Sequence, residues 1–280
     1  LHYPLRRQRQ MCIRDSNEKA FSKIKEELTG FSSKLVTKDI RFIPISAING
    51  DNIVNRSHKM QWYEGSTLLH TLENIHIASD YNLIDCRFPI QNVIRPQIKE
   101  FHDFRGYAGR ISGGVFKKGD EVVVLPSGFH SKIKSIITFN KEIEEAHAPM
   151  SVTLTLSDDL DISRGDMIVR ENNQPRILKE IELMVCWLGE NPLTEKGKYA
   201  VKHTSNEVRG IVKEVLYKID INTLHRNVND LKINCNDIAR ITMKLSQPLL
   251  VDKYKDNRST GSLIIIDENT NNTVGAGMII

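Results

Sequence analysis

The sequence lacks the features that mark membrane, secreted and metal-stabilised proteins. Its apolar runs stay well below the roughly 18 residues that a membrane-spanning helix needs. No continuous apolar segment follows the arginines near the start, as a secretory signal would require. The four cysteines form no Cys-x-x-Cys pair and are far apart: Cys12, Cys86, Cys186 and Cys235. This spacing argues against a zinc site or a disulfide framework and favours reduced thiols in a cytoplasmic protein.

Complete catalytic motifs are missing as well. The sequence contains no Gly-x-x-x-x-Gly-Lys-Ser/Thr loop to hold a β,γ-phosphate, no His-x-x-x-His metal pair and no Gly-x-Ser-x-Gly elbow. Its nine histidines are scattered, and His203 lies in a strand-like stretch where a structural or surface role is expected. We therefore expect no complete active site, and we assign no catalytic residue and no metal ligand.

The part of the chain after residue 16 is not strongly basic either. The first 16 residues carry +3 of the net charge of +4, so the rest of the chain carries only +1. A near-neutral body has no obvious electrostatic footprint for nucleic acid. The alternative is a basic patch that the average hides.

The N-terminal third of the chain predicts the tail of an α/β domain. Residues 1–15 have no helical or strand period and resemble translated adapter sequence, so we expect a non-native segment that does not pack on the body; a native basic tail is the alternative. From residue 16 to residue 80 the pattern is helix, strand, helix. The first helix is capped at Ser16–Asn17, ends at Gly30 and has one apolar face, made by Ala20, Phe21, Ile24 and Leu28. The buried parallel strand is expected over 40–46, and the second helix over 66–75 with Leu68, Leu69, Leu72 and Ile75 facing inward.

The remainder of the chain predicts two β-barrels. Short β-like runs separated by turn residues recur after Ser79. We expect one antiparallel barrel over residues 84–172 and a second over 176–280, without a long helix in the second. Within the barrels, Arg105 and Arg110 are expected to be solvated, Asp120 to belong to a turn, and Gly275 and Gly277 to allow close backbone approach.

One fragment of a binding site is recognisable. The segment PISAINGDNI, residues 44–53, directly follows the expected strand. Loops at the carboxyl end of a parallel strand are where α/β proteins bind nucleotides, and small residues there let backbone amides approach a flat base. A plain βα turn is the alternative.

This segment, together with WYEGSTLL at 62–69, resembles the end of the GTPase domain in translation-factor GTPases. The resemblance implies that Ser46 and Ala47 form the guanine loop, with the Ala47 N–H donating to the guanine oxygen. The phosphate loop, the switch aspartate and the Asn-Lys-x-Asp motif of that family would lie upstream. The chain is therefore expected to be an N-terminally truncated fragment that binds GTP weakly by itself.

The barrels narrow the resemblance to the GTP-binding large subunit of bacterial sulfate adenylyltransferase. The matching strings include FRGYAG at 104–109, ISRGDM at 162–167 and NRSTGSLIIID at 257–267, and similar segments cover nearly all of residues 17–280. The resemblance implies adenylyl sulfate synthesis from ATP and sulfate, coupled to GTP hydrolysis, with GTP and Mg²⁺ as cofactors of the complete protein. It also implies a small adenylyl-transferring subunit as partner, and neither nucleic acid nor membrane. The alternatives are a translation elongation factor that delivers aminoacyl-tRNA and a two-barrel interaction module without a nucleotide.

Overall fold

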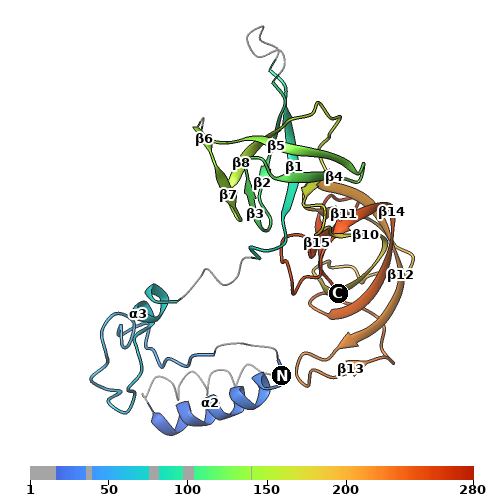
Figure 1. The fold of residues 1–280 in the computed structure, drawn as a ribbon. Coiled ribbons are helices and arrows are strands. Elements are labelled where there is room, and N and C mark those ends of the chain that lie inside the picture. The colour runs from blue at the N-terminus through green and yellow to red at the C-terminus, as the bar shows by residue number, and fades with distance from the viewer. Residues whose placement is uncertain (1–16, 36–39, 76–81, 97–103, 140) are drawn as a thin grey trace. The chain divides into compact units, whose positions relative to one another are not determined.

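The computed structural model describes residues 17–35, 40–75, 82–96, 104–139 and 141–280. The chain divides into two compact units, Leu1–Ala78 and Ser79–Ile280. The segment predicted to be non-native, residues 1–15, lies outside the described residues. Figure 1 shows the helices in the first unit and the strands of two barrels in the second.

The first unit begins with helix α2 (Glu18–Ser32). Asn17 caps it as predicted, because its side-chain oxygen accepts the backbone N–H groups of Lys19 and Ala20 at 2.9 and 3.3 Å. The predicted end at Gly30 is wrong, since the helix continues for two more residues. The position of Gly30 is open, with nothing within 4 Å of an added Cβ, and it has no positive φ. A glycine without the left-handed conformation does not stop a helix.

Helix α3 (Leu68–Glu73) is shorter than predicted and is capped by Thr67. Leu69, Leu72 and Ile75 were expected to face inward, but all three are exposed. Residues 40–45 form no strand, and Ser46 makes only an isolated bridge. Both differences have the same cause, because the described part of this unit contains no further strand or helix layer to pair with the segment or cover the helix.

The first barrel follows the period-two pattern of its sequence. In β5, Ile133 is buried while its neighbours Lys132 and Lys134 are exposed, as a half-buried strand requires. The strands of the closed ring are β4 (Glu121–Leu125), β9 (Met167–Val169), β1 (Arg87–Ile94), β2 (Gly106–Arg110), β8 (Ser151–Leu156) and β5 (Phe129–Thr138), in that order, and the pairing of β4 with β5 closes it. Strand β6 (Lys141–Ile143) extends β5 as a hairpin, and β3 (Val115–Lys117) pairs with β7 (Glu145–His147).

The second barrel is also a closed ring of six strands, but its strand order differs and three of its strands are 12 to 14 residues long. Its ring is β11 (Lys198–His203), β15 (Ser262–Ile266), β16 (Thr273–Ile279), β10 (Arg176–Trp187), β14 (Ile238–Val251) and β12 (Asn206–Ile219), closed by the pairing of β11 with β12, and β13 (Arg226–Asn227) is attached to β12. A Cβ at Gly275 would lie 3.2 Å from the Trp187 ring, and one at Gly277 would lie 3.0 Å from Leu263. The predicted close approach at these glycines is therefore present.

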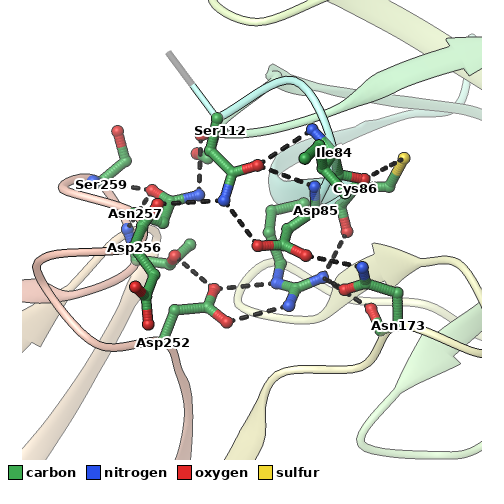
Figure 2. Close-up of polar contacts among 12 residues, drawn as sticks. Ile84, Asp85, Cys86, Ser112, Asn173, Asp252, Asp256, Asn257 and Ser259 are labelled. Carbon is green, nitrogen blue, oxygen red and sulfur yellow. Dashed lines mark hydrogen bonds and ion pairs between the residues drawn. The ribbon is translucent and has the colours of Figure 1, made fainter. Parts of the chain in front are cut away.

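An apolar contact and a polar network join the two barrels within the second unit. Leu250 of β14 belongs to a buried cluster with four residues of the first barrel: Val123, Leu125, Met167 and Val169. Beside this cluster, Asn257 donates from its side chain to the carbonyl of Ser112 at 3.0 Å, and Asn82 donates to the carbonyl of Asp256 at 3.0 Å (Figure 2). The fold is thus a small unit with two helices followed by two antiparallel β-barrels. The predicted fold class is confirmed, although the described part of the first unit contains no strand; the predicted domain boundaries stay predictions.

Candidate functional site

The loop after residue 45 is a tight turn closed by its own backbone. The N–H of Ser46 donates to the carbonyl of Asp51 at 3.1 Å, and the N–H of Ile53 donates to the carbonyl of Gly50 at 3.3 Å. Gly50 has φ +74°, a conformation that glycine adopts without steric cost. The Ser46 hydroxyl oxygen lies 3.4 Å from the backbone nitrogen of Asn49 and accepts its N–H. Ser46 is therefore a residue that shapes the turn.

Ala47 lies on the outer side of this turn. Its side chain is exposed, and its backbone N–H makes no hydrogen bond to any residue that the structure describes. The following side chain, Ile48, is also exposed. The turn thus presents an open backbone donor beside a methyl group, which is the chemistry that a planar ring with a carbonyl acceptor can use.

Asn52 holds the turn in place, and the sequence analysis did not identify it. Its side chain is 1% exposed; it donates to the carbonyl of Pro44 at 2.9 Å and accepts the N–H of Ser57 at 2.8 Å. Its own carbonyl accepts the N–H of Leu68, at the start of α3, at 3.0 Å. Asn52 also has φ +56°, which asparagine tolerates better than most residues. The sequence signal that could have identified Asn52 is its position two residues after Gly50, the glycine of the turn.

Asp51, also in this turn, has one carboxylate oxygen with a hydrogen-bond partner and one without among the described residues. One of its carboxylate oxygens, Oδ1, accepts the Ser57 hydroxyl at 2.8 Å. The other, Oδ2, is buried and has no hydrogen-bond partner among the described residues. Buried polar atoms are rarely left unpaired because the desolvation is not compensated.

Beside the turn, residues of α2 and of the extended segment 41–45 line a largely apolar hollow of about 390 Å³. Phe21 packs there against Trp62, with ring centroids 5.3 Å apart. No group of three or more His, Cys, Asp or Glu side chains that could hold a metal ion occurs in the described ranges. What the described part of the first unit offers a ligand is therefore the backbone N–H of Ala47 beside a small side chain.

The barrel residues that the sequence singled out lie in structural positions. Arg110 is exposed as predicted and donates to the carbonyl of Pro149 at 3.1 Å. The prediction that Arg105 is solvated is wrong, because its side chain is only 25% exposed, donates to the carbonyl of Leu160 at 2.7 Å and pairs with Asp159. Asp120 accepts the N–H of Lys117 at 2.9 Å, which is the predicted turn role. Asp120 also pairs with Arg170 at 2.8 Å.

His203 is 1% exposed, and its Nε2 lies 2.8 Å from the carbonyl oxygen of Thr260. Burial lowers the pKa of this histidine, and the hydrogen bond to Thr260 and the charge of Asp252 offset that effect only in part. A neutral ring in a barrel wall fits the structural role expected for His203.

None of the described helices is long and apolar enough to cross a membrane.

The fold defines a structural class, because two antiparallel β-barrels after a small helical unit resemble the arrangement in solved translation factors. The family described as GTP-eEF1A C-terminal domain-like matches residues 180–280. The structure resembles that of sup35 complexed with GDP, with a TM-score of 0.64, 19% identity, and coverage of 95% of this chain and 65% of sup35. It also resembles elongation factor SelB from Methanococcus maripaludis, with a TM-score of 0.58, 19% identity, and coverage of 94% of this chain and 54% of SelB. At this identity the likeness shows the fold alone.

Sequence relatives are more specific than the fold. The chain is 46% identical, over 94% of its length, to the bifunctional enzyme CysN/CysC of Mycobacterium tuberculosis, covering 43% of that protein. It is 44% identical, over 96% of its length, to sulfate adenylyltransferase subunit 1 of Alteromonas mediterranea, covering 56% of that protein. Over most of its own length, the chain is therefore a homologue of proteins named sulfate adenylyltransferase subunit 1 or CysN. It spans about half the length of the curated relatives that it matches.

Proposed function

We propose that the complete protein is the GTP-binding subunit of a sulfate adenylyltransferase and couples GTP hydrolysis to the formation of adenylyl sulfate from ATP and sulfate. The observation that carries this proposal is the similarity to relatives of that name, 44% or more identical over 94–96% of this chain. The similarity includes both barrels as well as the first unit. A match confined to the generic GTPase end would not separate this enzyme from a translation factor.

Within that protein, the turn at Ser46 and Ala47 receives the guanine base. The open N–H of Ala47 donates to the guanine carbonyl oxygen, and the small side chain lets the ring approach. Asn52 is the positioning residue, because its hydrogen bonds fix the turn to Pro44 before it, to Ser57 after it and to Leu68 at the start of α3. The unpaired Oδ2 of Asp51 is free to accept one further donor from upstream sequence.

Phosphate and Mg²⁺ do not fit the residues present. The described residues contain no cluster of metal-binding side chains, and the sequence contains no phosphate-binding loop. Phosphoryl transfer by this class needs such a loop with its lysine, and a hydroxyl and carboxylate to hold the metal ion. We therefore attribute base recognition to this chain and derive no step of GTP hydrolysis from it.

The partner in this proposal is a small subunit that carries out the adenylyl transfer, as the designation "subunit 1" of the relatives suggests. The compartment we propose is the cytoplasm, where thiols stay reduced; Cys86, Cys186 and Cys235 are all free. The alternative, an elongation factor carrying aminoacyl-tRNA, is supported by structural likeness at 19% identity, which concerns the fold.

The test is to express the complete protein with its upstream sequence together with the small subunit. We expect adenylyl sulfate from ATP and sulfate, stimulated by GTP and accompanied by GTP hydrolysis. Tight binding of aminoacyl-tRNA, with no response to the small subunit, would establish the elongation-factor alternative instead.

A further inference from the structure

The outer wall of the second barrel carries a row of basic side chains around one isoleucine. Lys198 of β11 pairs with Ile211 of β12, and Ile211 pairs with Lys244 of β14. Residues directly opposite each other on neighbouring strands point to the same side of a sheet. Since all three are exposed, this row faces outward, and Ile211 is 40% exposed between two lysines.

A second row lies next to the first. The backbone N–H of Arg209 donates to the Ser246 hydroxyl at 3.1 Å, so these two residues of β12 and β14 are opposite each other. Arg209 also forms a 2.8 Å ion pair with Glu268, which follows β15. The two rows border a hollow of about 570 Å³. A second hollow of about 730 Å³ adjoins it, and both hollows are lined by Arg209, Ser246 and Glu268. We call this continuous depression the lysine trough; its side chains of interest are Lys179, Lys198, Arg209, Ile211 and Lys244.

The charge of the lysine trough is not neutralised by the barrel itself. Lys179, Lys198 and Lys244 form no ion pair with a carboxylate of the described residues. The nearest acidic residue along the row, Glu180 opposite Lys244, is held by Lys213 at 2.6 Å. Three unpaired ammonium groups around an apolar floor therefore make a local basic patch on a chain whose net charge is only +4.

This combination fits an acidic protein surface better than a nucleic acid. The apolar contact is offered by Ile211, and none of the residues that line the hollow has an aromatic ring on which a base could stack. A protein segment with carboxylates flanking an apolar side chain complements both the lysines and the isoleucine.

We propose that the lysine trough is the docking surface for the small adenylyl-transferring subunit, which contacts it through an acidic segment with an apolar anchor. This inference rests on the proposed function and adds the surface by which the partner is held. The lysines accelerate and orient the encounter, because complementary charge acts mainly on association and register. Ile211 supplies the contact that excludes water.

The test compares variants of the complete protein for binding to the purified small subunit. The double charge reversal Lys198→Glu/Lys244→Glu is expected to raise the dissociation constant at least tenfold. Raising the salt from about 0.05 to about 0.3 M should weaken binding of the original protein more than that of the variant, since screening removes the attraction that the variant lacks. Ile211→Ser should weaken binding with the salt dependence unchanged. The double reversal Lys134→Glu/Lys141→Glu on β5 and β6 of the first barrel makes the same change of charge at two other exposed lysines; it is the matched control and should bind as the original protein does.

The outcomes separate the two proposals when adenylyl sulfate formation is measured in the same preparations. If the original protein binds the small subunit and is active, but the double reversal binds equally well, the lysine trough is not the docking surface and the proposed function stands. If the original protein neither binds the small subunit nor makes adenylyl sulfate, both proposals fail. Binding of single-stranded polyuridine that is lost in the double reversal, without an effect on the small subunit, would make the trough a nucleic-acid surface.

Discussion

Arg87 of the first barrel and Asp252, which follows β14 of the second, form a bidentate ion pair at the interface between the barrels. The Nε and Nη2 atoms of Arg87 lie 2.8 and 2.9 Å from the two carboxylate oxygens of Asp252. The third nitrogen, Nη1, donates to the carbonyls of Cys86 and Asn173 at 2.9 and 2.7 Å. Thr260 donates its hydroxyl to the same carboxylate at 2.6 Å. With Arg87 only 2% exposed, the pair is a buried, saturated network that fixes the first barrel to the second.

Removing one partner of this pair should therefore be costly. Asp252→Ala leaves a buried guanidinium without its counter-charge, and we expect a loss of about 3–5 kcal/mol in the free energy of unfolding. The matched control is Lys213→Ala at the exposed Lys213–Glu180 pair, where the loss should stay below about 1 kcal/mol. Urea unfolding of the 280-residue chain measures both. Equal, small losses in the two variants would show that the interface does not depend on the ion pair.

This interface also shows where sequence reasoning stops. The alternation of apolar and polar residues predicted both barrels, because half-buried strands have a local period that a single sequence reveals. Arg87 and Asp252 are 165 positions apart and belong to different barrels, and neither has a local pattern that points to the other. Similarly, the apolar face of α3 was predicted to be buried from its period, but periodicity only says that a face can be covered and does not supply the covering element. The turn at Ser46 and Ala47 was predicted from a resemblance to known sequences. The role of Asn52, which holds that turn, follows only from its hydrogen bonds in the folded chain.

Phe139 adopts an unfavourable conformation that a substitution should relieve. It lies between β5 and β6 with φ +45°, and its side chain is 96% exposed. Left-handed backbone costs a residue with a bulky side chain roughly 1–2 kcal/mol, and asparagine tolerates it better. Phe139→Asn should therefore stabilise the chain by about 0.5–1 kcal/mol and raise the melting temperature by a few degrees. The control is Phe129→Asn, at an exposed position within β5, which should destabilise because asparagine is a poor strand residue. A lower melting temperature for Phe139→Asn would mean that the phenyl group makes a stabilising contact.

His203 should make the stability of the second barrel depend on pH. Its folded-state pKa is lowered, chiefly by burial, from an unfolded value of about 6.5, so the unfolded chain binds a proton more readily than the folded chain. Stability is thus at its full value above about pH 6.5 and falls as the pH drops from there toward the folded pKa. His203→Gln keeps an amide donor for the Thr260 carbonyl but does not titrate. We expect the melting temperature of the original chain to fall more steeply than that of His203→Gln between about pH 7 and pH 5. Parallel curves would show that His203 does not contribute.

Ala47 provides the most direct test of the guanine turn in the complete protein. A bulky side chain at this exposed position would stand where the base approaches, so Ala47→Phe should raise the dissociation constant for GTP at least tenfold, equivalent to about 1.4 kcal/mol. Ala47→Gly, which keeps the backbone N–H and adds no bulk, is the control and should bind GTP nearly as the original protein does.

The basal reaction of ATP and sulfate without GTP should be the same in both Ala47 variants, because no adenylyl-transferring residue has been placed at this turn. Calorimetry with GTP and with ATP measures the two affinities separately. The weaker binding should be specific to GTP, since in the proposed function the acceptor for the Ala47 N–H is the guanine carbonyl, which adenine lacks. An unchanged GTP affinity in Ala47→Phe would show that the base lies elsewhere even though the family is correct. Equal losses for GTP and ATP would instead indicate that the substitution had disturbed the fold around Asn52, whose side chain bonds to Pro44 and Ser57 on either side of the turn.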